Sequence, residues 1–324
     1  MKWGIVFWVV LLIAAAGAFW TYERKANNVI SPVINKILPQ PLDKYTIENL
    51  GKREYKSQII LDNAVATTSA YTKYIFHFDS DGKKVTGLAT IPSSCKKCPV
   101  IAQFHGYVDS KTYQPGMGTA HSAEYYAANG FISLAPDFLG LGGSDMPSAD
   151  VFEERFQTYT ASLNLLAAIK TWNRSNGHIG VWGHSNGGQI ALTVMEISKL
   201  NYPTVLWAPV SQFFPYSILY FTDEADDHGK LLRRELAKFE QNYDTDLYSL
   251  TNYLNRLQAP LQIHQGTADP SVPKKWNDAL VSQIKKVNPN LKVNYFIYPG
   301  ADHNLTPGWN SAVNRDILFY KMLK

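Results

Sequence analysis

The sequence is poor in cysteine, in net charge and in repeated or low-complexity tracts. It has two cysteines in 324 residues, and two thiols alone cannot supply the four ligands of a structural zinc site. The net charge is only +4. No block of lysine and arginine occurs, so we expect no nucleic-acid partner. Apolar residues are nevertheless 45% of the chain and aromatic residues 13%, which is enough for a substantial folded core.

The two cysteines, Cys95 and Cys98, are separated by two lysines and followed by Pro99 and a strand-like run. A redox-active C-x-x-C pair normally opens a helix, whose N-terminus stabilises the thiolate. An extended run in that position instead favours a small structural disulfide that closes a turn. Two free thiols are the alternative interpretation.

The N-terminal residues 3–20 form an uninterrupted apolar or small run, with charged residues on both sides. A helix over this run would be about 27 Å long, enough to span a bilayer core. Residues 1–20 are therefore predicted to be a transmembrane anchor or a secretory signal with a small-residue cleavage site at 16–18. The flanking charges nearly balance, which leaves the membrane orientation open. Both interpretations predict a membrane-anchored or exported protein whose main domain lies outside the cytoplasm.

The remainder of the chain predicts a linker, residues 21–44, and one large α/β domain, residues 45–324. Apolar runs at 55–61, 71–78 and 84–91 predict antiparallel strands. After residue 99, strand-like runs alternate with helical patterns. The strand-like runs are 100–104, 131–135, 178–182, 204–207, 261–264 and 293–298, and the helical patterns are 120–128, 152–172, 189–198, 274–286 and 312–323. This alternation predicts a mostly parallel, twisted sheet with helices on both faces, and catalytic groups at the carboxyl ends of its strands.

Residues 211–258 interrupt this alternation, because they contain helical stretches at 230–240 and 247–257 but no strand-like run. We expect this segment to be an inserted helical cap over the active site; ordinary surface helices are the alternative. Phe213, Phe214 and Tyr216 are predicted to line an apolar substrate-binding wall.

A G-x-S-x-G sequence at residues 183–187 lies between a strand-like run and a helical run. This context predicts a nucleophile elbow that carries Ser185. The glycines at 183, 187 and 188 allow the strand and helix backbones to approach closely. A serine hydroxyl is a weak nucleophile without a base, so the prediction depends on partners elsewhere in the chain.

Two later strand-to-loop passages supply these partners, with Asp269 after one strand and His303 after the next. In such a site the histidine takes the serine proton, while the carboxylate orients the ring and stabilises its charged form. The competing candidates are weaker. His184 follows Gly183 at the elbow and points away from the Ser185 hydroxyl. His264 lies within a strand. Asp302 directly precedes His303 in the sequence, and a carboxylate next to a histidine in the chain rarely orients that histidine's ring.

The oxyanion formed during acyl transfer needs two hydrogen-bond donors. The backbone N–H of Asn186 is predicted to be the first, and the backbone N–H of Tyr107 or its hydroxyl the second. A turn at Gly106 without a catalytic role is the alternative. The glycine-dense loop at 135–144 has neither the ending of a phosphate-binding loop nor dinucleotide spacing. We expect neither a cofactor nor a metal.

Three stretches together resemble the α/β-hydrolase superfamily, and more narrowly the catalytic domain of the prolyl oligopeptidase family of serine peptidases. They are the G-x-S-x-G-G at 183–188, the H-x-G-x-x-D-x-x-V-P at 264–273 and the Y-P-G-x-x-H at 298–303, within a resemblance over residues 80–324. The chain has no room for the β-propeller of that family. Its His-Gly-Tyr at 105–107 is similar to a stretch of acetyl-xylan and cephalosporin esterases.

The resemblance implies a serine hydrolase that acts through an acyl-enzyme, most like a prolyl oligopeptidase-type serine peptidase with a short peptide substrate. A carboxylesterase or acetylesterase acting on a small-molecule ester is the first alternative, because both chemistries pass through the same intermediate. A non-catalytic binding protein of the hydrolase fold is the second. The presence of a serine, an aspartate and a histidine in the required order argues against it.

Overall fold

The computed structural model describes residues 40–321, nearly all of a compact unit that begins at Pro41. The predicted membrane or signal helix, residues 1–20, lies outside the described residues, as does most of the predicted linker. The end of that linker belongs to the compact unit, because Leu42 is buried and a 3-10 turn, η1 (Asp43–Tyr45), follows. No helix within residues 40–321 is both long enough and apolar enough to cross a membrane.

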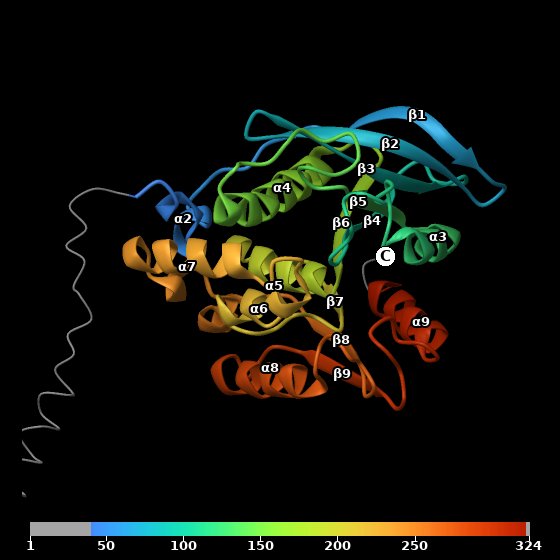
Figure 1. Ribbon diagram of the computed structural model, residues 1–324. Coiled ribbons are helices and arrows are strands. Elements are labelled where there is room, and N and C mark those ends of the chain that lie inside the picture. The colour runs from blue at the N-terminus through green and yellow to red at the C-terminus, as the bar shows by residue number, and fades with distance from the viewer. Residues whose placement is uncertain (1–39, 322–324) are drawn as a thin grey trace, which may run out of the picture. The chain divides into compact units, whose positions relative to one another are not determined.

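Nine strands of the described region form one sheet in the order β1-β2-β3-β5-β4-β6-β7-β8-β9 (Figure 1). The strands are β1 (Ile60–Thr67), β2 (Tyr71–Ser80), β3 (Lys83–Pro92), β4 (Cys98–Phe104), β5 (Ile132–Pro136), β6 (Ser175–His184), β7 (Thr204–Trp207), β8 (Leu261–Gly266) and β9 (Val293–Tyr298). The pairings among β1, β2, β3 and β5 are antiparallel, and all others are parallel. The carboxyl ends of the parallel strands therefore meet at one edge.

Helices cover both faces of the sheet, as the strand–helix alternation predicts. On one face lie α4 (Val151–Thr171), α5 (Asn186–Ser198) and α8 (Lys274–Val287), and on the other lie α3 (Ala120–Ala128) and α9 (Trp309–Tyr320) (Figure 1). A short helix, α2 (Ile47–Leu50), packs beside α5. The predicted α/β class and mostly parallel sheet are confirmed.

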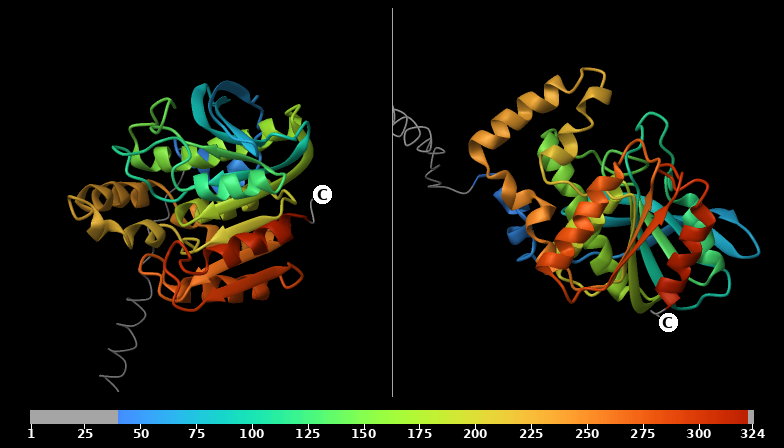
Figure 2. Two further views of the ribbon diagram at one scale, coloured as in Figure 1. Left: turned by 90° about the vertical axis from the view of Figure 1, so that its right-hand side faces the viewer. Right: turned by 90° about the horizontal axis from the view of Figure 1, so that it is seen from below.

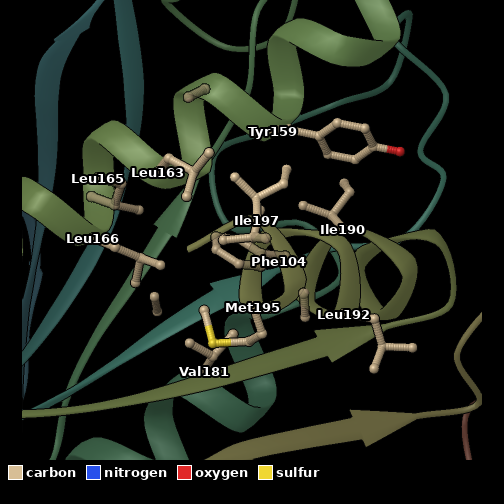
Figure 3. Packing of buried hydrophobic residues seen from close by; sticks show 14 of the residues in the cluster. Phe104, Tyr159, Leu163, Leu165, Leu166, Val181, Ile190, Leu192, Met195 and Ile197 are labelled. Atoms are coloured by element: carbon tan, nitrogen blue, oxygen red, sulfur yellow. The ribbon is translucent and has the colours of Figure 1, made fainter. Parts of the chain in front are cut away.

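The larger part of the core lies under α4 and α5. Figure 3 shows Leu163 and Leu166 of α4 and Met195 of α5 packed toward Phe104 and Val181 of the central strands. All five side chains are at most 3% exposed, and each such side chain stabilises the fold by about 1.5–3 kcal/mol through burial. The middle strands are held rigidly by this packing, so the residues at their ends have fixed positions.

The first strand differs from the prediction. It was expected at 55–61, and it is found at Ile60–Thr67. Nearly all of its residues are exposed, including Ile60 at 51% and Val65 at 54%. A strand that buries neither face leaves no alternating hydrophobic signal, so its position cannot be read from the apolar pattern.

The segment 211–258 connects β7 to β8 and stands out from the body of the unit (Figure 2). It contains α6 (Tyr216–Leu219), the turn η2 (Thr222–Glu224) and α7 (Lys230–Asn242). The helix predicted at 247–257 is wrong: three 3-10 turns replace it, η3 (Thr245–Tyr248), η4 (Leu250–Asn252) and η5 (Leu254–Arg256). Ser249 accepts a hydrogen bond from the backbone N–H of Phe214, and the Asn252 amide donates to the carbonyl of Asp246. Such side-chain bonds to the backbone compete with a continuous helix.

Candidate active site

Ser185 occupies the sharp turn between β6 and α5. Its backbone has φ 57° and ψ −121°, a region that non-glycine residues rarely adopt and that costs on the order of 1–3 kcal/mol. The turn is fixed on both sides: the Ser185 N–H donates to the carbonyl of Trp207 (2.9 Å), and the Ser185 carbonyl accepts from the N–H of Val210 (3.0 Å). The serine side chain is therefore presented at the carboxyl edge of the sheet.

Glycines around Ser185 allow this turn to form. A Cβ atom on Gly187 would overlap the carbonyl oxygen of Phe104, and one on Gly183 would overlap the carbonyl oxygen of Gly187. A Cβ on Gly188 would lie 2.6 Å from the Cβ of Pro209. Backbone atoms cannot move aside cheaply, so only glycine fits at these positions.

Asp269 and His303 meet at the same edge, each in the loop that follows a strand. The Nδ1 atom of His303 lies 2.9 Å from Oδ2 and 3.1 Å from Oδ1 of Asp269. The carboxylate also accepts the backbone N–H groups of Ser271 and Val272, both at 2.9 Å. These bonds hold the aspartate so that it can orient the ring.

The charge of Asp269 follows from these bonds. Its side chain is fully buried, and burial by itself raises the pKa of the carboxyl. The hydrogen bonds from His303, Val272 and Ser271 outweigh burial and lower the pKa below its ordinary value. Asp269 is therefore ionised at neutral pH and accepts a proton-bearing Nδ1, which leaves Nε2 of His303 free to accept a proton.

His184 ties the loop of His303 to the elbow. Its Nε2 lies 2.9 Å from the backbone carbonyl of His303, and the two rings are 4.6 Å apart. Burial and the neighbouring His303 lower the pKa of His184 to about 4, so the ring is neutral and donates its Nε2–H. Among residues 40–321, Ser185 Oγ and the His303 ring make no direct hydrogen bond. Such bonds are often long in ligand-free sites and shorten when substrate binds.

The loop after β4 packs directly against Ser185. A Cβ on Gly106 would lie 2.9 Å from the Cβ of Ser185, so the next residue, Tyr107, begins beside the nucleophile. The Tyr107 side chain is 89% exposed. The second predicted donor, Asn186, is the first residue of α5, where backbone N–H groups have no acceptor within the helix.

A buried carboxylate, Asp137, supports this loop from below. It accepts hydrogen bonds from Thr86 (2.6 Å) and Tyr113 (2.7 Å), and its backbone carbonyl lies 3.4 Å from Nε2 of His105. Burial raises the pKa of Asp137, and the bonds from Thr86 and Tyr113 oppose that rise. No sequence pattern points to Thr86 or Tyr113, because they lie on a distant strand and an irregular loop.

The three aromatic residues predicted to line a substrate wall have different positions. Phe213 and Tyr216 are partly exposed and stack on each other, with ring centroids 5.6 Å apart. Phe214 is 3% exposed and packs among core rings, including Phe156 and Phe239. The prediction for Phe214 is corrected accordingly: its side chain belongs to the core and does not form an exposed wall.

The other sequence candidates have structural partners. Cys95 and Cys98 form a disulfide. His264 is buried and bonds Asp316, and Asp302 accepts the backbone N–H groups of its own turn. No group of three or more potential metal ligands occurs among the described residues.

A sequence model of the dienelactone hydrolase family matches residues 87–308, a range that contains Ser185, Asp269 and His303. No protein of curated function matches the sequence. The structure is similar to acetyl xylan esterase 1 from Thermoanaerobacterium sp., with TM-score 0.65 and 18% identity over 88% of this chain and 94% of that chain.

Peptidase structures are similar as well. A puromycin-hydrolyzing peptidase from Mycobacterium tuberculosis has TM-score 0.60 and 15% identity over 80% of this chain and 41% of that chain. A putative dipeptidyl aminopeptidase IV from Bacteroides ovatus has TM-score 0.60 and 18% identity over 81% of this chain and 37% of that chain. At these identities the likenesses show the α/β-hydrolase fold.

Proposed function

The chain belongs to the dienelactone hydrolase family and is a serine hydrolase of the α/β-hydrolase superfamily, and from this premise we propose that it hydrolyses carboxylic esters with small acyl groups. The observation that carries the proposal is the hydrogen-bonded pair of Asp269 and His303 beside the Ser185 elbow. The proposed roles are nucleophile for Ser185, general base for His303 and orienting carboxylate for Asp269.

The reaction proceeds in two halves. Ser185 Oγ attacks the ester carbonyl carbon as His303 Nε2 takes its proton, and the backbone N–H groups of Asn186 and Tyr107 stabilise the oxyanion. The intermediate collapses to an acyl-serine and expels the alcohol, which takes the proton from His303. Water then attacks the acyl-serine with His303 again as base, releasing the acid and restoring Ser185.

A cavity beside the proposed oxyanion site supports a small acyl group. It has a volume of about 220 Å³ and is lined by residues of α4, the start of α5 and the loop after β5, among them Leu139, Arg155, Tyr159, Asn186 and Ile190. Leu139, Val151 and Ile190 offer apolar surface to a short acyl chain, beside the charged Glu154 and Arg155, and the volume suits a small acyl group. The similarity to acetyl xylan esterase 1 over 94% of that chain also favours an ester substrate.

A prolyl oligopeptidase-type peptidase is the second candidate. Three sequence stretches resemble that family, and the fold is shared with the puromycin-hydrolyzing peptidase, of which this chain covers 41%. An amide substrate would form the same acyl-enzyme with an amine as leaving group. The two candidates therefore differ in substrate and not in the residues that act.

A substrate panel distinguishes the candidates. The purified full chain is assayed with p-nitrophenyl acetate, butyrate and octanoate, and with aminoacyl and prolyl p-nitroanilides. We expect the acetate or butyrate ester to have the highest kcat/KM and the octanoate to fall at least about tenfold lower. Dominant anilide cleavage would select the peptidase. No turnover, together with no labelling of Ser185 by a fluorophosphonate, would indicate a non-catalytic binding protein.

We further propose that residues 1–20 attach the protein to a membrane, with the catalytic domain outside the cytoplasm. The apolar run at 3–20 supports the attachment, and the disulfide between Cys95 and Cys98 supports an oxidising compartment. Fractionation tests both parts: we expect the full chain in carbonate-washed membranes and sensitive to protease added from outside the cytoplasm. Recovery in the soluble cytoplasmic fraction would contradict the proposal.

A further inference from the structure

A second, larger cavity lies on the opposite face of the sheet from α5, between the first turns of α3 and α9. Its volume is about 500 Å³. Figure 1 shows α3 and α9 side by side on that face, and contacts between the two helices agree with the view. The serine mechanism uses none of the side chains that line this cavity.

Aromatic rings form the floor and one wall of the cavity. Trp182 and Trp207 lie at its floor and are 2% and 3% exposed. Trp309 and His121 stack with centroids 3.8 Å apart and form a wall near the mouth. Each of these two stacked rings covers one face of the other, so the wall offers an outer ring face to the flat, C–H-bearing face of a ring-shaped ligand.

The polar groups around these rings are uncharged. Among residues 40–321, no lysine, arginine, aspartate or glutamate lines the cavity, and its exposed amide and hydroxyl members are Asn304, Thr306 and Asn310. An ionic ligand would thus find no opposite charge within the lining. Amide and hydroxyl groups can both donate and accept hydrogen bonds, which matches a ligand with several hydroxyl groups.

Two groups deeper in the cavity have unused hydrogen-bonding capacity. The indole N–H of Trp182 is buried and has no partner among residues 40–321. His184 is neutral and uses its Nε2–H on the carbonyl of His303, so its Nδ1 is an acceptor. A donor and an acceptor on neighbouring residues of the floor suit a hydroxyl group, which is both.

The helix termini add donors. The N-cap residue of α3, Thr119, makes no side-chain hydrogen bond to its helix, and the N-cap residue of α9, Gly308, has no side chain. Of the first-turn N–H groups of α3, that of Ala120 already donates to the carbonyl of Gly116. The first-turn N–H groups of a helix have no acceptor inside the helix, and both first turns border the cavity. They favour oxygen acceptors on the ligand.

We propose that this cavity, defined by His121, Trp182, His184, Trp207, Asn304 and Trp309, binds a neutral sugar ring. The ring stacks on the aromatic wall, and its hydroxyl groups bond the amides, the floor pair and the helix N-termini. The bound sugar lies directly behind the loop of His303, because Asn304 follows that residue and His184 contacts its carbonyl. The site is separate from the chemistry of Ser185.

Isothermal titration calorimetry tests the proposal. The full chain carrying Ser185→Ala is titrated with xylobiose, cellobiose and N,N′-diacetylchitobiose, in a detergent without a sugar headgroup. Because the variant does not turn over, the result does not depend on the proposed hydrolase function. We expect saturable binding of at least one disaccharide with a Kd of about 1 mM or tighter. Absence of binding by all three at 20 mM titrant (a concentration on the order of twenty times that Kd) would overturn the proposal.

Variants locate the site. Trp309→Ala should weaken the binding at least tenfold by removing the wall, and Asn310→Ala, an exposed position, should weaken it several-fold without loss of folding. Trp182→Phe keeps an aromatic ring but removes the unpartnered N–H together with the five-membered ring of the indole, so it should weaken binding about fivefold. Trp172→Phe, at the end of α4 and outside the cavity, is the matched control and should bind normally. If all four variants bound the sugar with equal affinity, the sugar would bind elsewhere on the protein. If sodium sulfate bound in place of the sugars, the cavity would be an anion site. Either result would contradict the proposal.

Discussion

Single side chains around Ser185 have roles that follow from their contacts. The strained backbone of Ser185 is held by the carbonyl of Trp207 and the N–H of Val210, so the turn does not depend on the hydroxyl group. Asp269 and His303 are held by each other, and His184 binds the carbonyl of His303. The proposed nucleophile, the proposed base and the residue that holds its backbone can therefore be substituted one at a time.

Ser185→Ala removes the proposed nucleophile and leaves both backbone hydrogen bonds of residue 185 in place. We expect kcat/KM for the best ester to fall by at least about 10⁴-fold, since removal of a triad member eliminates most of the rate enhancement. The melting temperature should not fall. Steady-state assays and thermal unfolding of both forms measure this, and turnover of the purified variant within tenfold of the parent would contradict the serine mechanism.

His184 gives the fold a pH dependence of definite sign. Its pKa is lowered to about 4 in the folded chain against an ordinary value of about 6.5 when unfolded. The unfolded chain binds the extra proton first, so stability is fully present above about pH 6.5 and is lost as the pH falls toward 4. Between pH 7.5 and 5.0 the loss attributable to this one ring is about 2 kcal/mol.

Urea unfolding of the parent and of His184→Gln at pH 7.5 and 5.0 isolates this contribution. We expect the parent to lose about 2 kcal/mol more than the variant over that interval. Glutamine keeps an N–H donor for the His303 carbonyl, so the variant should fold. Identical pH dependence in the two proteins would show that His184 is not held neutral by its surroundings.

At the scale of elements, the β6–α5 junction is a close backbone contact between three elements. The first turn of α5 lies against the end of β4, where Gly187 touches the carbonyl of Phe104. The loop after β4 lies in turn against Ser185 through Gly106. Strand β4, the turn at Ser185 and the loop after β4 are thus packed together, and a change in the spacing between any two of them moves the third.

Gly187→Ala tests this packing. Its Cβ would overlap the carbonyl oxygen of Phe104, so the helix must shift, and we expect a loss of about 3 kcal/mol or more in unfolding free energy. Gly177→Ala is the control: its Cβ meets no atom within 4 Å, and only its φ of +91° is unfavourable, at a cost of about 1–2 kcal/mol. Denaturant unfolding compares the two, and a Gly187→Ala variant as stable as the control would contradict the close contact.

The sequence predicts the first and last residues of some helices and strands correctly and misses other elements. Residues 204–207, 293–298 and 120–128 are predicted with the bounds that the structure has, because a proline or glycine follows within two residues of each end. Strand β1 and the turns at 245–256 are missed, since exposed side chains and side-chain-to-backbone bonds shape them.

The same limit applies to the site. Ser185, Asp269 and His303 can be proposed from sequence because each follows a strand in a recognisable motif. The hydrogen bonds of Thr86 and Tyr113 to Asp137 cannot, since they join segments that are 51 and 24 residues away from Asp137. Contacts of this kind become visible only when the sheet order is known.

At the scale of the whole molecule, one buried carboxylate on α9 links that helix to α3 and to two strands of the sheet. Asp316 of α9 is fully buried and accepts hydrogen bonds at 2.9 Å from Tyr126 of α3, Trp207 of β7 and Gln262 of β8. The Nε2 atom of His264, which also lies on β8, is 2.9 Å from Oδ1 of Asp316, the same oxygen that accepts from Gln262. Four elements far apart in the sequence therefore depend on a single acceptor.

Asp316→Asn replaces a carboxylate oxygen by an amide that donates. At least one of the surrounding donors then has no acceptor in a site without water access, and a buried donor without a partner costs on the order of 1–3 kcal/mol. Loss of the charge-assisted bonds adds to this, so we expect a total loss of about 3 kcal/mol or more. Asp223→Asn is the control, because that side chain is 92% exposed and should change stability by less than about 0.5 kcal/mol. Urea unfolding compares the two variants. Equal midpoints would show that α9 is held by apolar packing alone. The position of Trp309, at the start of α9, would then not depend on the hydrogen bonds of Asp316.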